Sequence, residues 1–337
     1  MQVREVFFTD KRNCQVLTRD ENTGLAPDSV RIKNRYSLIS PGTELALWTK
    51  THIGFEDPDI AWCRYPIKAG YSSVGTIEAV GSNIKNWEVG QNVVHFQTHA
   101  DFSVLDPKKD IILPLSDPEH MKCALFTRFA QISFTAAQAS NCSGFALVLG
   151  GGIIGNMCAQ IMKQFFDRKT ILADISANRV ALAERCGLKA VNNSSDSNFR
   201  ETLQDLTNGA GVSTVVEATG VNSMVSYALE LMNTHGETIL LSSTRGLAEI
   251  NVYKLIHRKF AALIGAHENR YPKFADGNKP SHYSFAKAAL EGILSEKLKV
   301  EPFITDIISP YEMNDAYEAL LNTPEQHIGI IIDWERK

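Results

Sequence analysis

The sequence has no excess of charge of either sign and no long apolar run. Its 34 lysines and arginines against 38 aspartates and glutamates give a formal net charge of −4. This balance offers no electrostatic basis for binding nucleic acid or an anionic membrane surface. No apolar run approaches the ~20 residues that a membrane-spanning helix requires, and no apolar signal segment follows the charged start at Met1–Glu5. We therefore expect a cytoplasmic protein whose partner is a small molecule, with no nucleic-acid or membrane partner.

Cysteine and histidine are present but form no metal-binding pattern. The nine histidines are scattered, and the six cysteines form no C-x-x-C pair; they are Cys14, Cys63, Cys123, Cys142, Cys158 and Cys186. Structural zinc sites use closely spaced thiols and imidazoles. The sequence therefore predicts reduced thiols and no structural zinc site.

What the sequence does contain is a glycine-rich turn between two apolar runs. After the run 146–149, three glycines follow at the spacing G-x-G-x-x-G. The first permits a tight turn, the second lets a pyrophosphate approach the backbone, and the third lets the next helix pack close to the strand. This order predicts a βαβ unit that binds a dinucleotide. The expected contacts to the cofactor are Gly150, Gly152, Ile153, Ile154 and Gly155.

A helix and an acidic residue complete this motif. Residues 156–166 carry apolar side chains at helical spacing, and the start of such a helix offers free N–H groups to an anion. The second apolar run ends at Asp174, whose carboxylate can accept hydrogen bonds from both ribose hydroxyls of adenosine. A 2′-phosphate would face this carboxylate, and the nearest cation, Arg179, follows a turn into the next helix. We therefore predict NAD, bound near Asp174, Ile175 and Arg179. A βαβ unit without a ligand is the alternative interpretation.

Two regions of different pattern predict two domains in an α/β protein. Residues 1–110 contain short strand-like runs and glycine turns, which are typical of a small, partly open barrel. From Pro118 onwards, strands alternate with helices, beginning with an alanine-rich helix expected over 119–141. This alternation predicts a parallel sheet with right-handed crossovers. The helix expected at 283–294 is predicted to return the chain to the first domain.

The chain resembles the medium-chain dehydrogenases/reductases, the superfamily of alcohol, sorbitol and threonine dehydrogenases and quinone oxidoreductases. The resemblance rests on residues 75–93, the glycine motif, Asp174, and Val216-Glu217-Ala218-Thr219-Gly220. It implies a GroES-like, β-rich catalytic domain made of residues 1–120 and 271–337. It also implies a Rossmann NAD-binding domain, with a doubly wound parallel sheet, made of residues 121–270.

The sequence departs from the zinc-dependent members of this superfamily at each ligand position. The segment 39–44, Ile-Ser-Pro-Gly-Thr-Glu, stands where those members have a cysteine. Gly70-Tyr71-Ser72 replaces Gly-His-Glu, and Thr127-Arg128 lies near the third ligand. Serine, tyrosine and threonine are poor zinc ligands. The chain therefore resembles the zinc-free branch, and we predict that it has no catalytic metal.

Without a metal, a protein group must stabilise the negative charge that develops on the carbonyl oxygen. Tyr71 occupies a former ligand position and is the first candidate for the hydrogen-bond donor or general acid. Thr43 stands where the family has a proton-relaying Ser or Thr, and Lys68 is a further catalytic candidate. A packing tyrosine and a turn hydroxyl are the alternative interpretations of Tyr71 and Thr43. Glu44 is expected to pair with a basic residue.

Further cofactor contacts are expected where later strands end. Small residues follow two strands at the carboxyl edge of the predicted sheet, where ligands of open α/β sheets bind. They are Thr219, Gly220, Ser242 and Ser243, and Gln131 is expected near the nicotinamide.

The sequence therefore predicts a zinc-independent, NAD-dependent alcohol or polyol dehydrogenase. The resemblance suggests a cyclic polyol or a sugar as substrate, and a homodimer in which the strand at 260–264 pairs with its copy. Two alternatives stay open: a metal-free reductase of activated C=C bonds, and an NAD-binding protein without turnover.

Overall fold

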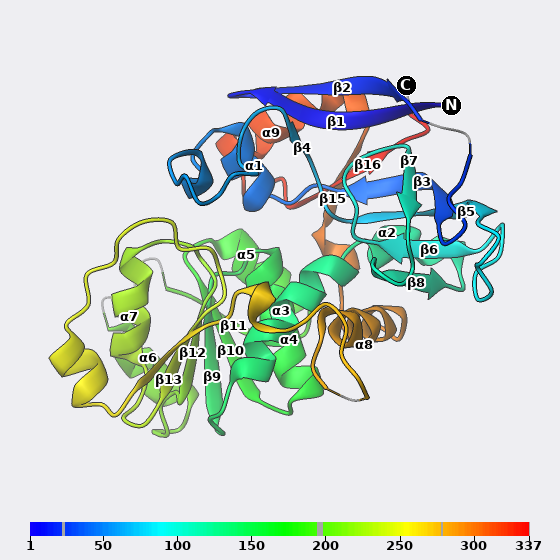
Figure 1. Cartoon of the computed structure of the whole chain (residues 1–337). Helices are drawn as coiled ribbons and strands as arrows, with labels where there is room; N and C mark the ends of the chain where they lie inside the picture. The colour runs from blue at the N-terminus through cyan, green and yellow to red at the C-terminus, as the bar shows by residue number, and fades with distance from the viewer. Residues whose placement is uncertain (22–23, 194–197, 278, 337) are drawn as a thin grey trace. The chain divides into compact units, whose positions relative to one another are not determined.

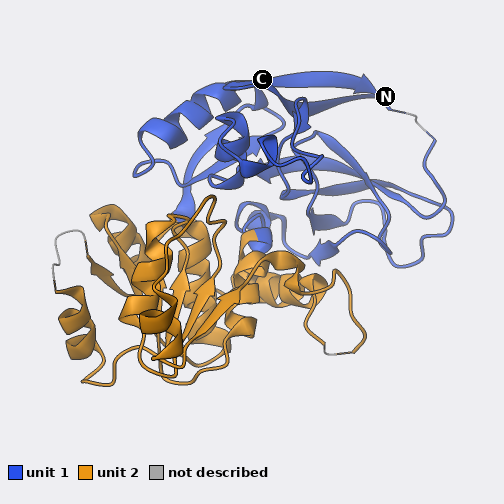
Figure 2. Cartoon of the chain, turned by 60° about the vertical axis from the view of Figure 1, so that its left-hand side comes forward, with its two compact units in different colours: residues 1–128, 303–337 blue, residues 129–302 orange. Residues whose placement is uncertain are grey.

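The computed structural model describes residues 1–21, 24–193, 198–277 and 279–336, which form two compact units. Unit 1 comprises Met1–Arg128 and Phe303–Lys337, and unit 2 comprises Phe129–Pro302. Figure 2 colours the two units separately and shows that both chain ends belong to unit 1.

The strands and helices of unit 1 come from both ends of the chain. The strands are β1 (Gln2–Asp10), β2 (Asn13–Asp20), β3 (Val30–Leu38), β4 (Ile67–Lys68), β5 (Ser73–Val80), β6 (Asn92–His95), β7 (Phe102–Leu105), β8 (Ile112–Leu115), β15 (Ile304–Ile308) and β16 (Gly329–Asp333). The α-helices are α1 (Thr43–Trp48), α2 (Met121–Ala124) and α9 (Met313–Asn322).

In unit 1, the described strands form two sheets. One has the order β2-β1-β4, and the other has the order β15-β16-β3-β5-β6-β8 with β7 also paired to β3. An isolated bridge between Glu5 and Ala100 links β1 to the segment before β7. One core of unit 1 includes Phe8, Trp48 and Tyr317, each fully buried. The prediction of a β-rich first domain is confirmed.

Unit 2 alternates strands with helices. Its strands are β9 (Phe145–Leu149), β10 (Lys169–Asp174), β11 (Lys189–Asn192), β12 (Thr214–Glu217), β13 (Glu237–Leu240) and β14 (Ala262–Gly265). Its helices are α4 (Ile153–Phe165), α5 (Ala177–Arg185), α6 (Phe199–Leu206), α7 (Ser223–Leu231) and α8 (His282–Leu294), with most of α3 (Thr127–Ala139).

The strands of unit 2 form the predicted doubly wound parallel sheet. Their order is β11-β10-β9-β12-β13-β14, and every neighbouring pair is parallel. The order reverses direction at β9 and β12, and Figure 1 shows α6 and α7 on the opposite face of the sheet from α4. Residues 146–149 of β9 are at most 1% exposed, as expected for a strand covered on both faces. The carboxyl ends of β9 and β12 lie where the strand order changes direction, and open α/β sheets bind their ligands at this point.

Both boundaries between the units lie further along the chain than predicted, the second by the larger distance. The units divide at 128/129 and 302/303, whereas the sequence predicted 120/121 and 270/271. Helix α8 packs within unit 2, because Phe285 stacks on Phe134 of α3 with ring centroids 5.6 Å apart. Gly292 of α8 also lies close to Phe165 of α4. The helix expected to return the chain to the first domain is therefore part of the second.

The alanine-rich segment is also divided differently. The sequence predicted one helix over 119–141, but the structure has α2, a turn at Leu125–Phe126, and α3. The turn is closed by a hydrogen bond from the Phe126 N–H to the Cys123 carbonyl, 3.0 Å long. It separates the two helices while it buries Leu125 and Phe126 completely.

The helices and the cysteines each bear on an expectation from the sequence. The described helices include none long and apolar enough to cross a membrane. None of the six cysteines forms a disulfide, and their reduced state stays a prediction.

Candidate functional site

The three glycines of the motif have the geometry that the sequence predicted. Gly150 directly follows β9 and has a φ of 104°, which a residue with a side chain rarely adopts. A Cβ on Gly155 would collide with the Gly150 carbonyl oxygen, so glycine is needed where α4 crosses the turn. A Cβ on Gly152, by contrast, would meet nothing within 4 Å. This glycine is the N-cap of α4 and has no side-chain cap, so its open side can admit a phosphate to the helix N-terminus.

Asp174 lies directly beside this turn. It ends β10, and its Oδ2 accepts a hydrogen bond of 2.6 Å from the Gly151 N–H. Its Oδ1 accepts one of 2.8 Å from the Ser176 N–H, so the carboxylate is fixed at the carboxyl edge of the sheet. Ile175, the next residue, is 71% exposed, which leaves an apolar surface suited to an adenine ring. These positions fit the adenosine half of a dinucleotide.

Arg179 is closer to the carboxylate than its position in the sequence suggested. Its guanidinium nitrogen Nη1 lies 3.9 Å from Asp174 Oδ2. The reason is that Ser176 caps α5, accepting a hydrogen bond from the Arg179 N–H, and this first turn carries the arginine back toward β10. A cation therefore does lie beside the position where the 2′-oxygen of a bound adenosine is expected.

A buried glutamate, Glu217, organises the next part of the sheet edge. It ends β12 with no exposed surface. Its Oε1 accepts hydrogen bonds from the N–H groups of Thr219 (2.7 Å) and Gly220 (3.1 Å), and also from the Thr219 hydroxyl. Its Oε2 accepts one from the Ser242 hydroxyl, 2.6 Å long. One carboxylate thus fixes three of the predicted contact residues relative to one another, a role that the sequence had not assigned to Glu217.

The remaining cofactor candidates are placed in the same unit. Ile153 opens α4 and is 6% exposed. The Ile154 carbonyl accepts a hydrogen bond of 2.9 Å from Ser133 of α3, and Gln131 is buried two residues earlier on that helix. Ser243 is exposed beyond β13. The structure therefore gathers the glycine motif, Asp174, Glu217 and its partners along one edge of the sheet, and contact of Gln131 with the cofactor stays a prediction.

A separate cluster of polar side chains in unit 1 surrounds Tyr71. The Tyr71 hydroxyl forms a hydrogen bond with Ser40 Oγ and interacts with the Thr43 side chain at the start of α1. The guanidinium carbon of Arg128 lies 5.2 Å from the centroid of the Tyr71 ring. Ser72 ties this segment to the turn before α3, because its Oγ donates to the Leu125 carbonyl over 2.6 Å. Two candidates that the sequence proposed, Tyr71 and Thr43, are thus brought together.

The surroundings of Tyr71 keep its hydroxyl protonated. Removal of water by the surrounding protein raises the pKa of Tyr71 above its usual value, and Ser40 and the Arg128 charge offset only part of this effect. The hydroxyl is therefore neutral at pH 7 and can donate a hydrogen bond. A neutral donor is what an oxygen that gains negative charge requires.

Next to this cluster, Glu44 joins three distant parts of the chain. Its Oε1 accepts a hydrogen bond of 2.7 Å from the Ser40 N–H. Its Oε2 lies 3.1 Å from His99 Nε2 and accepts one of 2.6 Å from the Tyr317 hydroxyl. Glu44 and His99 are at most 1% exposed. The prediction that Glu44 pairs with a basic residue is confirmed, and the network holds Ser40 in place against Tyr71.

Lys68 does not join the Tyr71 cluster, contrary to the prediction that it is catalytic. Its ammonium group forms an ion pair with Glu5 at 3.0 Å, and its side chain is 51% exposed. Because β4 pairs with β1, Lys68 lies opposite Phe7 at the sheet surface. Its partner Glu5 is buried, so the ion pair holds Lys68 against β1, and these contacts offer no reason for a catalytic role.

The donor set in unit 1 does not fit a catalytic zinc ion. Such sites use three protein ligands drawn from His, Cys, Asp and Glu. In the described part of the chain, no three of these side chains are grouped so that they could hold a metal ion. At the former ligand positions stand Tyr71, hydrogen-bonded to Ser40, and Thr127, which is fully buried.

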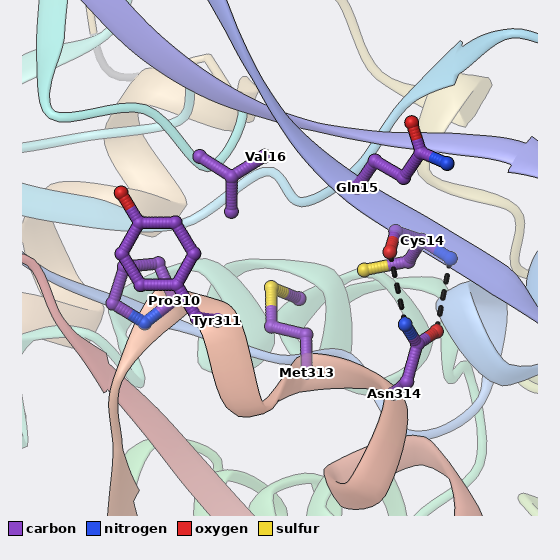
Figure 3. Close-up of a pocket in the computed structure, with 7 residues that line it drawn as sticks. All are labelled: Cys14, Gln15, Val16, Pro310, Tyr311, Met313 and Asn314. Carbon is purple, nitrogen blue, oxygen red and sulfur yellow. Dashed lines mark hydrogen bonds between the residues drawn. The ribbon is translucent and has the colours of Figure 1, made fainter. Parts of the chain in front are cut away.

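A cavity of ≈ 320 Å³ in unit 1 lies elsewhere, against β2 and the start of α9 (Figure 3). It is lined by Cys14, Gln15, Val16, Pro310, Tyr311, Met313 and Asn314. The Asn314 amide is already engaged, donating to the Cys14 carbonyl (3.0 Å) and accepting from its N–H (2.9 Å). The cavity shares no residue with the Tyr71 cluster, and we do not assign the reaction to it.

A doubly wound sheet with a dinucleotide-type glycine turn, joined to a β-rich unit built from both chain ends, defines a class of two-domain dinucleotide-binding proteins. Residues 154–276 match the family described as zinc-binding dehydrogenase. This match over part of the chain agrees with the resemblance to the medium-chain dehydrogenases/reductases that the sequence motifs indicated.

Known dehydrogenases are also similar to this chain over most of its length. L-threonine 3-dehydrogenase of Chelativorans sp. is 23% identical over 273 residues, which cover 70% of this chain and 76% of the relative. An alcohol dehydrogenase from Escherichia coli CFT073, solved with NADH, has a TM-score of 0.80 at 16% identity and covers 99% of both chains. A zinc-binding dehydrogenase from Sinorhizobium meliloti 1021, solved with NADP, has a TM-score of 0.77 at 16% identity and the same coverage. At such identities the two structures show a common fold.

Proposed function

We propose that this protein is a metal-independent dehydrogenase that transfers a hydride between NAD(H) and an alcohol or ketone. The observation that carries the proposal is the neutral, hydrogen-bonded Tyr71 hydroxyl at a position where zinc-dependent members have a ligand. The reaction needs a dinucleotide site and a group that stabilises the reacting oxygen. Unit 2 would provide the dinucleotide site, and unit 1 would provide the group that stabilises the reacting oxygen. Polyols and sugars are the first substrates to test.

The residues of unit 2 account for binding of the dinucleotide. The N–H groups at the start of α4 would bind the pyrophosphate, and Asp174 would accept hydrogen bonds from the ribose hydroxyls. Glu217 would hold the Thr219–Gly220 turn and Ser242 in position along the rest of the cofactor. When bound, the nicotinamide accepts or donates the hydride.

The residues of unit 1 account for the alcohol oxygen. During ketone reduction, the Tyr71 hydroxyl would donate its hydrogen bond to the oxygen that gains negative charge, and it would pass its proton to that oxygen. Thr43 and Ser40, which contact the same hydroxyl, would hold it in position and supply the route for a replacement proton. In alcohol oxidation the same groups would accept the proton.

We propose NAD as the preferred cofactor, on the basis of Asp174. Its carboxylate, fixed by two backbone N–H groups, would repel a 2′-phosphate. Arg179 at 3.9 Å partly offsets this repulsion. The expected preference is therefore a difference in affinity, not an exclusion of NADP.

The experiment is a steady-state assay with NAD and a panel of polyols and secondary alcohols, run beside NADH with quinones and enones. Tyr71→Phe should lower kcat by about 10²–10³-fold, the usual effect of removing one preorganised donor, while NAD binding stays unchanged. Tyr65→Phe is the matched control, because Tyr65 also donates its hydroxyl to a group in unit 1, the Leu47 carbonyl. An unimpaired Tyr71→Phe enzyme would contradict the role given to Tyr71.

The metal is tested separately. Activity should survive extensive chelation, and elemental analysis should find less than one zinc per chain. Activity that disappears with the chelator and returns with Zn²⁺ would contradict the metal-free mechanism. Turnover of enones but of no alcohol would replace it with reduction of C=C bonds.

A further inference from the structure

Arg128 is held beside Tyr71 by two aromatic rings. Its guanidinium carbon lies 5.2 Å from the centroid of the Tyr71 ring and 5.2 Å from that of Phe96. Phe96 follows β6 directly, and Arg128 is the second residue of α3. The Ser72 hydrogen bond to the Leu125 carbonyl brings the two segments together. Three separate parts of unit 1 thus place one positive charge next to the proposed donor.

The chemistry of a guanidinium indicates what such a charge can do. It carries five N–H donors in a rigid, planar fork. It stays charged at any working pH, and its fork matches the two oxygens of a carboxylate or phosphate. The two rings also hold the side chain in place, so less conformational freedom is lost when an anion binds.

We infer that the substrate is an anionic alcohol, and that Arg128 binds its carboxylate or phosphate group while Tyr71 contacts the hydroxyl that reacts. This inference rests on the proposed function, because it takes the Tyr71 hydroxyl as the position of the reacting oxygen. Arg128 contacts the ring of the same tyrosine, so the charged group of the substrate lies only a few bonds from the carbinol carbon. Small 2-hydroxy acids and short polyol phosphates meet this requirement.

The test uses pairs of probes that share a carbinol and differ in charge. Lactate is compared with lactamide, and glycerol 3-phosphate with glycerol, so that the carboxylate and phosphate are examined separately. For at least one pair, wild-type kcat/KM should favour the anionic member by about 10- to 100-fold, the range of a hydrogen-bonded ion pair. Arg128→Met should bring this ratio close to one. Arg128→Lys, which keeps the charge but not the fork, should give an intermediate ratio.

A matched control removes a different positive charge from unit 1. Arg31 forms an ion pair with Glu78 at 3.0 Å, so Arg31→Met changes the net charge by the same amount. Its ratio should equal that of the wild type. A wild-type ratio near one for both pairs, an unchanged ratio in Arg128→Met, or an equal loss in Arg31→Met would overturn the inference and leave the proposed dehydrogenase intact.

A binding measurement decides the matter if none of the probes is turned over. The side-chain resonance of Arg128 in ¹⁵N-arginine-labelled protein is assigned by its loss in Arg128→Met, and each probe is then titrated. If the Arg128 resonance changes its chemical shift with lactate or glycerol 3-phosphate, but not with lactamide or glycerol, the result would support an anion site at Arg128. The absence of any shift with both anions would overturn it, whatever the outcome for Tyr71.

Discussion

Removal of the Glu217 carboxylate should loosen the edge of the sheet that we assign to the cofactor. The carboxylate is fully buried and accepts hydrogen bonds from two backbone N–H groups and from the hydroxyls of Thr219, Ser242 and Thr244. In Glu217→Ala, the Thr219 and Gly220 N–H groups lose their acceptor. Both donors are only partly buried, so water can replace the lost acceptor, and we expect a net cost of about 0.5–1.5 kcal/mol for each, or about 1–3 kcal/mol for the pair.

Glu217→Gln separates the effect of charge from that of the acceptor. A glutamine keeps one oxygen for the two N–H groups and turns its amide toward the Ser242 and Thr244 hydroxyls, which can rotate to accept. Only the charge assistance is lost, which we expect to cost about 1–2 kcal/mol. The stability order is therefore wild type, then Glu217→Gln, then Glu217→Ala. Glu184→Gln, an exposed position on α5, is the control that removes an equal charge.

The assay should report on unit 2 alone. All four tryptophans, Trp48, Trp62, Trp87 and Trp334, lie in unit 1, so their fluorescence does not monitor this site directly. Hydrogen–deuterium exchange of peptides that contain residues 214–220 measures it. Exchange there should accelerate most in Glu217→Ala, and NAD should bind more weakly. Unchanged exchange in Glu217→Ala, with stability within about 0.5 kcal/mol of wild type, the usual range for surface changes, would refute the reasoning.

Three further predictions follow from other residues. Burial lowers the pKa of His95 to about 3, so the unfolded state takes up a proton below pH 6.5 that the folded state does not. The free energy of unfolding should therefore fall from pH 6.5 toward pH 3, by about 2 kcal/mol at pH 5. His95→Gln should make this pH dependence weaker, as measured by urea titrations. Asp174→Ser with Ile175→Arg should shift the ratio of kcat/KM from NAD toward NADP, and a wild type that already uses NADP at least as well as NAD would contradict the role of Asp174. The exposed edge strand β14 should pair with β14 of a second copy of the chain and form a dimer. Leu263→Lys should then give a monomer of 37.3 kDa by light scattering. A monomeric wild type would contradict this prediction.

The dinucleotide motif could be predicted from the sequence because its constraints are local. The left-handed φ of Gly150 and the close approach of Gly155 to the Gly150 carbonyl are both set within six residues. Ser176 as the cap of α5 is likewise a short-range feature. Spacing along the chain is therefore enough to locate these residues, and the doubly wound sheet follows from the alternation of strands and helices.

Other features could not be predicted, because partners far apart in the sequence determine them. Strand β2 is half exposed and mostly polar, so its pattern resembles that of a loop until it pairs with β1. Glu217 could be placed at the end of a strand, but its bond to Ser242 spans 25 residues. Helix α8 shows the same limit: periodicity predicted the helix, while only the stacking of Phe285 on Phe134 shows which unit holds it.

The segment around Glu44 shows why a list of missing ligands is an incomplete argument against a metal. Glu44 and His99 are buried 3.1 Å apart, and both are residue types that bind zinc. Spacing along the chain could not exclude a metal site built around Glu44 and His99, because 55 residues separate them. In the structure, however, both carboxylate oxygens already accept hydrogen bonds, one from the Ser40 N–H and the other from Tyr317, which lies 273 residues away. A metal would have to displace these donors from a buried carboxylate, at a cost of about 1–3 kcal/mol for each one left without a partner. The loss of the Ser40 bond would also release the hydroxyl that contacts Tyr71. The same network that engages Glu44 therefore positions the proposed donor, so metal binding at Glu44 and the function of Tyr71 would oppose each other.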